Sequence, residues 1–283
     1  MHEIPQIFDQ RLRRLRRTRA ALQPASMSFL ADTATEELAE RIASIKRNFV
    51  TPICYGVPLS QALSPHPWTK ADSIPQLIGR NGLVFDEGLL PFARQSIDTY
   101  VSVLSLHTIN DLPGALSQIR TCLKPDGLFL AALFGGQTLS ELRRVLSQAE
   151  IEIDGGLSPR IAPFADIRDA GALLQRAGFA LPVADADKIV VRYETPFTLL
   201  ADLRAMGETN MLVERRKTFL KRNILLRAMD LYAEQFTGAD GRVSATFEII
   251  YLAGWAPHES QQQPLKRGSA QVPLAQALKA IRD

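Results

Sequence analysis

Cysteine is scarce in this sequence, and long apolar runs are missing. Its two cysteines, Cys54 and Cys122, are too few and too far apart for a disulfide framework or a metal-binding set. We therefore expect no metal site and a reducing, cytoplasmic environment. The longest apolar run, residues 128–134, is far shorter than the roughly 20 residues that span a bilayer. No basic and then apolar segment with a small-residue cleavage site opens the sequence, so we expect no secretory signal.

A large excess of charge of one sign is also missing, since 33 lysines and arginines face 30 acidic residues. The distribution is uneven, however, because six arginines lie from Arg11 to Arg19, with Leu12, Leu15 and Leu22 between or just after them. One interpretation is a helix that packs its leucines on the domain and leaves the arginines in water, as charge runs usually do. The other is a basic helix that grips an acidic partner or contacts an anionic membrane surface. No other segment resembles a nucleic-acid motif, and we expect no nucleic acid as a partner.

Strand-like and helix-like periods alternate along the chain, which is typical of a parallel sheet with crossover helices. Residues 99–106 and 128–134 are apolar enough for strands that are buried on both faces. Between them, Asp111 is placed to cap a helix, and the Pro and Gly of residues 124–127 predict a turn at its end. The sequence therefore predicts an α/β fold.

A further pair of strands is predicted in the second half of the chain. Residues 188–193 and 246–255 both have strand character, and we expect them to pair antiparallel. A long helical stretch, residues 196–236, lies between them. An insertion between two strands usually lies over one end of a sheet, where functional residues gather.

Three carboxylates suggest a cofactor that contains adenosine. In Rossmann-like sheets, a carboxylate at the end of the second strand accepts hydrogen bonds from the ribose hydroxyls. Asp72 precedes a Ser-x-Pro helix start and has that position. Asp86 and Glu87 follow the expected third strand, from which they would reach an adenine amino group. Helix capping and loop solvation remain the alternative for each of them.

Several motifs carry a resemblance to known families. Those of the first set are Asp86-Glu87-x-Leu89-x-Pro91-Phe92, Leu104-Ser105-Leu106-His107-x-x-Asn110-Asp111-Leu112-Pro113 and Leu123-Lys124-Pro125-Asp126-Gly127. They resemble the class I S-adenosylmethionine methyltransferases. Those of the second set are Phe8-Asp9 with the arginine run, Phe134-Gly135-Gly136-x-Thr138-Leu139-x-Glu141-Leu142-Arg143, Gly155-Gly156-x-Ser158-Pro159, Met206-Gly207-Glu208-x-Asn210 and Gly254-Trp255-x-x-His258-Glu259-Ser260-Gln261. Through them the chain is similar to the methyltransferase-like assembly factor of mitochondrial respiratory complex I and its bacterial relatives.

This resemblance implies a Rossmann-like class I methyltransferase sheet with helices on both faces and a helical insertion between the last two strands. It implies three parts: a basic N-terminal helical segment (1–35), a methyltransferase-like domain (36–258) with the insertion at 196–236, and a polar C-terminal tail (259–283). The cofactor that it implies is S-adenosylmethionine. We expect this cofactor to be bound by Gly56, Asp72, Asp86, Glu87 and Ser105.

The resemblance also places one histidine within a motif. His107, with Asp111 four residues later, could transfer a proton at the end of the fourth strand, and these two are the expected catalytic residues. The alternative for His107 is a polar residue that packs under the cofactor. His258 and Glu259 could add ligands to an iron site beside His107.

The first strand and its loop depart from the family's pattern, Asp-x-Gly-x-Gly-x-Gly. Aligned without a gap, the sequence has Cys54, Gly56, Pro58 and Ser60 at those four positions. Side chains there intrude on the space that glycines leave for the methionine part of the cofactor. Pro52 is unexpected in a central strand, because proline cannot donate a ladder hydrogen bond. Either the cofactor site has degenerated, or the loop has rearranged and still binds.

Three functions are therefore open. The resemblance implies a methyltransferase-like protein that acts on a protein client in respiratory complex I maturation. For the mitochondrial member it implies hydroxylation of an arginine in a complex I subunit. The alternative from another class is a non-enzymatic assembly factor, whose basic N-terminus and helical insertion hold the client. The expected location is cytoplasmic, or peripheral at the inner membrane through Arg11 to Arg19.

Overall fold

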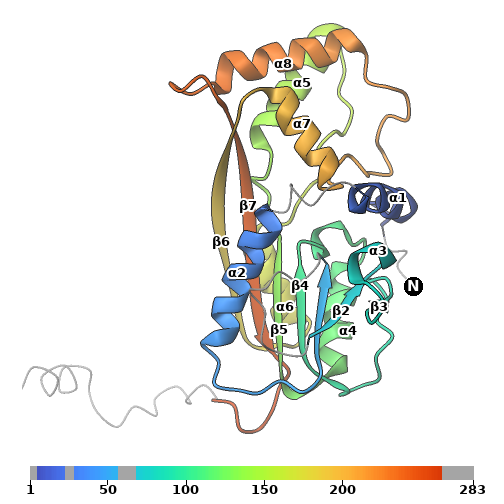
Figure 1. Cartoon of the computed structure of the whole chain (residues 1–283), viewed down its shortest axis with the longest axis vertical. Coiled ribbons are helices and arrows are strands. Elements are labelled where there is room, and N and C mark those ends of the chain that lie inside the picture. Colours follow the sequence, from blue (N-terminus) through green and yellow to red (C-terminus); the bar gives the residue numbers. More distant parts are fainter. Residues whose placement is uncertain (1–4, 23–28, 57–67, 263–283) are drawn as a thin grey trace, which may run out of the picture.

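The computed structural model describes residues 5–22, 29–56 and 68–262, which form a seven-stranded sheet flanked by helices (Figure 1). The strand order is β3-β2-β1-β4-β5-β7-β6, and β7 pairs antiparallel with both β5 and β6, while the other pairs are parallel. The strands are β1 (Pro52–Gly56), β2 (Thr69–Asp72), β3 (Leu83–Val84), β4 (Ile97–Val103), β5 (Leu123–Phe134), β6 (Ala180–Tyr193) and β7 (Val243–Trp255). The helices are α1 (Gln10–Ala21), α2 (Phe29–Ala43), α3 (Pro75–Ile78), the 3₁₀ turn η2 (Leu106–Thr108), α4 (Leu112–Cys122), α5 (Ser140–Asp154), α6 (Ile167–Arg176), α7 (Pro196–Ala205) and α8 (Arg222–Phe236).

Apolar side chains form a separate core on each face of the sheet. Val101 and Leu130 point to the face that also contains residues of α2, α5 and α8. Tyr100 and Phe129 point to the opposite face, toward α4 and α6. Neighbouring residues enter different cores because successive side chains of a strand alternate between its faces. This arrangement confirms the expected burial of β4 and β5 on both faces.

The expected strand–helix–strand unit is present, but its turn differs from the prediction. Asp111 caps α4 and accepts a hydrogen bond from the backbone N–H of Gly114, as expected. The turn predicted at residues 124–127 lies instead within β5, so this expectation was wrong. The pairing with β4 shifts there, because the four residues from Lys124 to Gly127 lie opposite the single residue Asp98, and Asp126 has a φ of 60°. Pro and Gly suit such a bulge for the same reason that they suit a turn, since both require irregular dihedrals.

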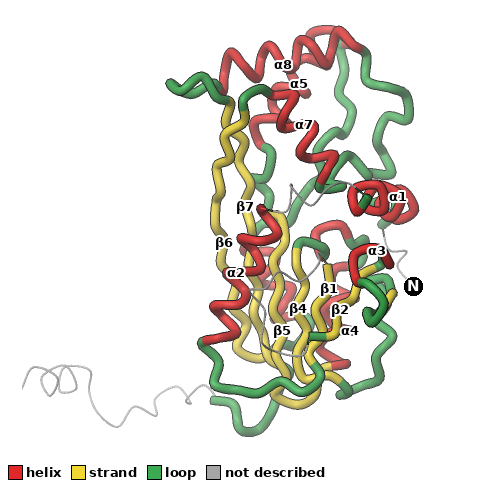
Figure 2. The backbone as a smooth tube through the Cα atoms, in the orientation of Figure 1, coloured by secondary structure: helices red, strands yellow, loops and turns green. Residues whose placement is uncertain are grey.

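The predicted antiparallel pair is confirmed by β6 and β7, which stay paired from Ala180↔Trp255 to Tyr193↔Val243. These two strands extend beyond the parallel strands and carry α7 and α8 at their far end (Figures 1 and 2). The helical insertion between the last two strands is therefore present. The expected boundary at residue 36 lies within α2, and the division into three parts stays a prediction.

Pro52 is accommodated in central β1 because it is the first residue of that strand, where a ladder donor is not needed. The chain just before it is fixed by Asp98 in β4. One carboxylate oxygen of Asp98 accepts hydrogen bonds from the backbone N–H groups of Val50 and Thr51 at 2.6 and 2.9 Å. These two hydrogen bonds fix the position at which β1 begins beside β4, and Pro52 takes no part in them.

Helix α1 has the reverse of the expected orientation. Arg13 and Arg17 are only 2% and 8% exposed, whereas Leu15 and Leu22 are 47% and 73% exposed. The interpretation of a helix with packed leucines and hydrated arginines was therefore wrong. Residues four apart lie on one face of a helix, so the face with Arg13 and Arg17 points inward. Figure 1 shows α1, in dark blue, between the helices α5, α7 and α8 and the upper edge of the parallel strands.

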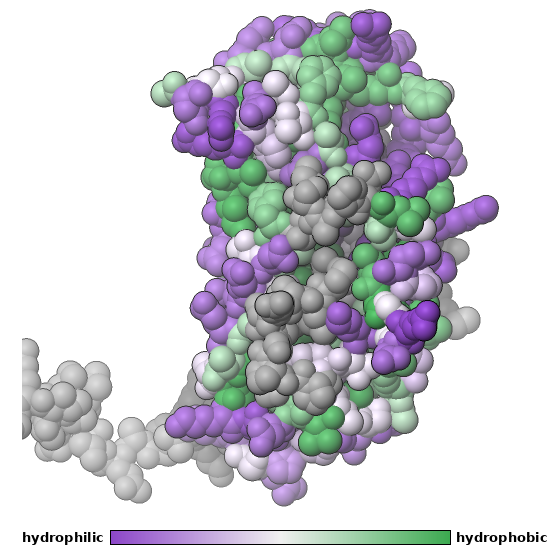
Figure 3. All heavy atoms as spheres, viewed as in Figure 1, coloured by the Kyte–Doolittle hydropathy of each residue, from purple (hydrophilic) through white to green (hydrophobic). Residues whose placement is uncertain are grey.

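The helices and the surface can be compared with what a membrane-spanning segment requires. In the part of the chain that the structure describes, no helix is long and apolar enough to cross a bilayer. Hydrophilic and hydrophobic patches are intermingled on the described part of the face in Figure 3.

The close contact between β1 and β4 predicts the effect of a small substitution. Gly56 has a φ of +118°, and a Cβ there would lie 2.1 Å from the carbonyl oxygen of Val103. We expect Gly56→Ala to lower the free energy of unfolding by about 2–4 kcal/mol, through backbone strain and overpacking. Chemical denaturation measures this loss. The matched control is Gly156→Ala, where a Cβ meets nothing within 4 Å, and equal losses in the two variants would contradict the argument.

Candidate functional site

The carboxyl ends of the parallel strands meet α1, and an ion pair lies at the centre of this contact. Arg17 of α1 donates from Nη1 to Oδ1 of Asp72 at 3.1 Å and from Nη2 to Oδ2 at 2.8 Å. Asp72 is the last residue of β2 and is fully buried. Its Oδ1 also accepts from the backbone N–H of Ile74, and Arg17 Nη2 reaches the carbonyl oxygen of Gly56 at 3.4 Å. Burial raises the pKa of Asp72, an effect that Arg17 opposes.

The second inward-facing arginine of α1, Arg13, forms its hydrogen bond close to the Arg17–Asp72 ion pair. Arg13 donates from Nη2 to the hydroxyl of Ser105, which follows β4, at 2.8 Å. Its Nη1 is buried without a hydrogen-bond partner among the described residues. Gly56, Asp72 and Ser105, three of the five expected cofactor residues, therefore lie together at this edge. Arg17 contacts the side chain of Asp72 and the carbonyl oxygen of Gly56, and Arg13 contacts the hydroxyl of Ser105.

Residues before α1 fix the position of the helix. The side-chain oxygen of Asn110 accepts from the backbone N–H groups of Ile7 and Phe8, and the N–H of Asp9 donates to the carbonyl of Met211. Asp9 then caps α1 and lies 3.2 Å from the guanidinium of Arg215. The N-terminal segment is thus attached both to the loop after β4 and to the segment between α7 and α8.

Glu87 is buried beneath the same edge. Its Oε1 accepts from the hydroxyl of Tyr100 at 3.1 Å, and its Oε2 has no partner in the described residues. Burial raises the pKa of Glu87 to about 7, although nearby hydroxyls and the charge of Arg13 oppose the rise. Its neighbour Asp86 accepts from the N–H of Gly88 and organises its own loop. The two adjacent carboxylates therefore have different environments.

His107 lies on η2, just after β4, and its partner is Glu208 rather than Asp111. Nε2 of His107 lies 3.4 Å from a carboxylate oxygen of Glu208. The ring packs between Phe134 and Phe164, with centroid distances of 4.8 and 5.5 Å. Burial works against the charge of Glu208, but His107, Arg17 and Arg13 outweigh it and lower the pKa of this carboxyl. Glu208 therefore stays ionised next to the two arginines of α1.

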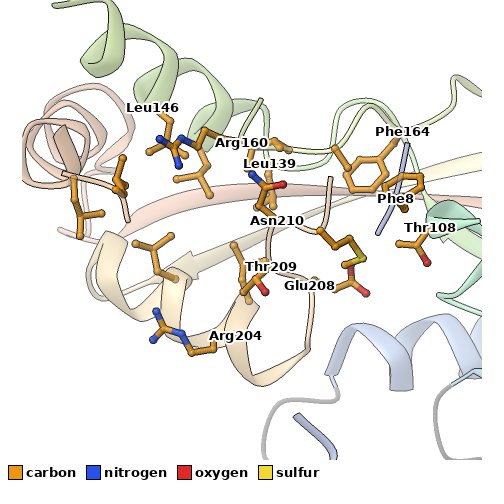
Figure 4. Close-up of a pocket in the computed structure, with 18 residues that line it drawn as sticks. Phe8, Thr108, Leu139, Leu146, Arg160, Phe164, Arg204, Glu208, Thr209 and Asn210 are labelled. Carbon is orange, nitrogen blue, oxygen red and sulfur yellow. The ribbon is translucent and has the colours of Figure 1, made fainter. Parts of the chain in front are cut away.

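A largely apolar cavity of about 330 Å³ begins at Glu208. In Figure 4, Glu208 lies near Phe8, Phe164 and Thr108 at one end of this cavity, and Leu146 lies toward the other. The remaining lining comes mainly from α5, α7 and the segments that follow them: Leu139, Leu142, Arg160, Ile161, Ala162, Leu200, Leu203, Arg204, Thr209, Asn210, Met211, Leu220 and Leu225.

Two of the family motifs meet at the wall of this cavity. Asn210 donates from Nδ2 to the carbonyl oxygen of Pro159 at 2.8 Å. Glu150, buried on α5, accepts from Ser158 and from the guanidinium of Arg160. Burial favours the neutral form of Glu150, but these donors prevail and lower its pKa. The motifs at 155–159 and 206–210 therefore belong to one structural unit.

Other expected residues lie elsewhere. Asp111 caps α4, which is its structural role. His258 follows β7 near Gln261, which donates to Asp126 toward the start of β5, whereas His107 packs on Phe134 at the end of β5. The idea that His258 and His107 share a metal site was therefore wrong, since they lie at opposite ends of that strand. Among the described residues, no group of three His, Cys, Asp or Glu side chains could hold a metal ion.

The sequence analysis missed the roles of Arg13, Arg17 and Glu208. The i, i+4 spacing of the two arginines was a signal that they share one face, but six arginines in nine residues concealed it. Glu208 lay within a family motif without a role assigned to it.

The fold and this site define a class I methyltransferase-like protein. A methyltransferase domain family matches residues 43–131. A solved structure from Bacillus halodurans, described as a methyltransferase, superposes with a TM-score of 0.50 at 16% identity, and covers 79% of this chain and 99% of its own. At that identity the likeness shows the fold alone.

More similar sequences identify the family. The human arginine hydroxylase NDUFAF5 is 42% identical over 94% of this chain and 81% of its own length. A malonyl-[acyl-carrier protein] O-methyltransferase of Xylella fastidiosa is 38% identical, but only over 61% of this chain and 56% of its own. The chain belongs to the NDUFAF5 arginine-hydroxylase family.

S-adenosylmethionine does not fit the site while α1 occupies it. Both carboxylate oxygens of Asp72, which would accept from the ribose hydroxyls, are bound by Arg17. Cys54 replaces the acid of the first strand and is buried, and burial raises the pKa of its thiol, so it supplies no charge. Pro58 and Ser60 lie outside the described residues. The departure at Cys54 and the ion pair at Asp72 thus both oppose binding of this cofactor.

The ion pair predicts a large effect on stability. Arg17→Gln leaves the carboxylate of Asp72 buried and uncompensated, and we expect the free energy of unfolding to fall by about 3–5 kcal/mol. Arg14→Gln, at an exposed position of the same helix, should change it by less than about 0.5 kcal/mol. Urea denaturation of both variants measures the difference. Similar stabilities would show that the buried arginine contributes no more than a hydrated one.

Glu87 predicts a dependence on pH. Its folded-state pKa of about 7 lies above the ordinary value of 4.5, so its stabilising effect is present in acid and is lost as the pH rises through 7. Between about pH 5 and pH 8, the wild type should lose about 1–3 kcal/mol of unfolding free energy relative to Glu87→Gln. Denaturation curves across that range test this, with exposed Glu214→Gln as the control. Parallel pH profiles of wild type and Glu87→Gln would refute it.

Proposed function

We propose that this chain is a methyltransferase-like maturation factor of respiratory complex I that binds an arginine-bearing segment of a protein client. The family supports this, because its human member is named an arginine hydroxylase. The motif at 206–210, by which the chain resembles the complex I assembly factor, lines the cavity beside the site, and Asn210 bonds it to Pro159 of the motif at 155–159. The observation that carries the proposal is the position of Glu208.

Glu208 has the properties of a receptor for a guanidinium group. Its carboxyl has a lowered pKa and stays ionised, and a carboxylate can accept two parallel N–H bonds from an arginine. His107 fixes its orientation from the side of the sheet. A client arginine paired with Glu208 would place the neighbouring apolar residues of the client at the opening of the cavity, which is lined mainly by apolar residues.

Hydroxylation of the bound arginine is the second candidate function, and the name shared by the human and zebrafish relatives favours it. In that case this chain's own residues would bind and orient the guanidinium, with Glu208 as the anchor. The chain would act in the cytoplasm or at the inner membrane. Contact with an anionic surface would use Arg11, Arg14 and Arg19, the exposed arginines of the N-terminal run.

Association with the client tests the proposal. The tagged full chain is purified from its own cells at low salt, and complex I subunits that accompany it are quantified by mass spectrometry. Glu208→Gln keeps the shape of the side chain but removes the charge, so we expect at least a fivefold loss of the associated subunit. Glu214→Gln, exposed on the same segment, should retain it. Equal recovery with both variants would reject Glu208 as the anchor, and no complex I subunit with the wild type would reject the function.

A further inference from the structure

We propose that Asp72 has become a guanidinium site in this protein: it binds Arg17 of the chain's own N-terminal helix, and an adenosine cofactor binds only when α1 leaves. The position of Asp72 at the end of β2 is the one from which a carboxylate holds the ribose of such cofactors. Here the parallel bonds from Nη1 and Nη2 of Arg17 engage both oxygens of that carboxylate. This inference is independent of the client.

The competition favours α1 for a physical reason. Arg17 offers Asp72 two parallel hydrogen bonds and a full positive charge, whereas ribose hydroxyls offer hydrogen bonds without a charge. A ribose that replaced Arg17 would also leave Asp72 as a buried charge without a counterion. The guanidinium of Arg17 lies within reach of Gly56 as well, so it covers the loop end of β1 together with the ribose position.

Helix α1 is held in a way that permits its release. Leu15 and Leu22 are exposed and Leu12 is half-buried, so undocking exposes no fully buried leucine. The attachments of the helix are polar: Arg13 to Ser105, Arg16 to the carbonyl of Asn210, and Arg17 to Asp72. Gly207 lets the helix approach closely, since a Cβ there would lie 3.3 Å from the Cα of Arg17. When α1 leaves, these polar groups can form hydrogen bonds to water in place of those within the protein.

Calorimetric titration with S-adenosylhomocysteine tests the competition. We expect Arg17→Gln to bind this ligand at least tenfold more tightly than both the wild type and the control Arg14→Gln. Arg17→Gln/Asp72→Asn should lose the gain, because the ribose carboxylate is then missing. Equal or weaker binding by Arg17→Gln would overturn the proposal. So would the absence of binding in every variant, since the altered loop would then exclude the ligand without help from α1.

A second measurement uses the wild type, so its result does not depend on the stability of Arg17→Gln. Hydrogen exchange of the wild-type chain reports the docking of α1 directly. In the absence of ligand the amides of α1 should be protected, and that protection should fall as S-adenosylhomocysteine saturates the protein. Protection that stays the same or rises at concentrations that give a heat of binding would show that α1 closes over the ligand, and would overturn the proposal.

Discussion

The burial of two guanidinium groups at the carboxyl edge of the sheet governs the arrangement of everything around it. Arg13 and Arg17 bring positive charge into a space that also contains Asp72, Glu87 and Glu208. A buried charge is costly unless a partner of opposite sign lies close to it, so each arginine requires a specific acceptor. The acceptors of the two arginines come from the ends of β1 and β2 and from the loop after β4, and their neighbour Arg16 donates to the carbonyl of Asn210 in the segment after α7. The N-terminal helix therefore connects the sheet to the helical insertion.

The carboxylates of this edge differ because their surroundings differ. Asp72 has a bidentate partner and a backbone donor, whereas Glu87 has one tyrosine hydroxyl and one oxygen without a partner. Glu208 lies beside His107 and both arginines, which keep it ionised. One edge of the sheet thus contains a bound carboxylate, a carboxyl that titrates near neutrality and a carboxylate next to an apolar cavity. This last arrangement suits the recognition of an arginine with apolar neighbours.

The site also shows how a methyltransferase fold can remain intact while its cofactor position changes. The sheet depends on the pairing of β4 with β5 and of β6 with β7, and on an apolar core on each of its faces. Cys54 lies in one of these cores as a buried neutral residue, in place of a carboxylate. Gly56 is retained where β1 passes closest to β4, which is a requirement of the backbone. Gly56 is thus retained for the fold, whereas Cys54 no longer supplies the charge that the cofactor would need.

Sequence alone determined the order and type of most elements, because apolar periodicity is a local property. The cap at Asp111, the burial of β4 and β5, the antiparallel last pair and the helices between its strands all followed from it. It also placed Gly56, Asp72 and Ser105 at the ends of their strands. What the tertiary structure decided was which face of α1 points inward and which charges meet there. Arg17 and Asp72 are 55 residues apart, and His107 and Glu208 are 101 apart. No local pattern encodes such pairs, because they depend on how the N-terminal helix and the insertion pack against the edge of the sheet.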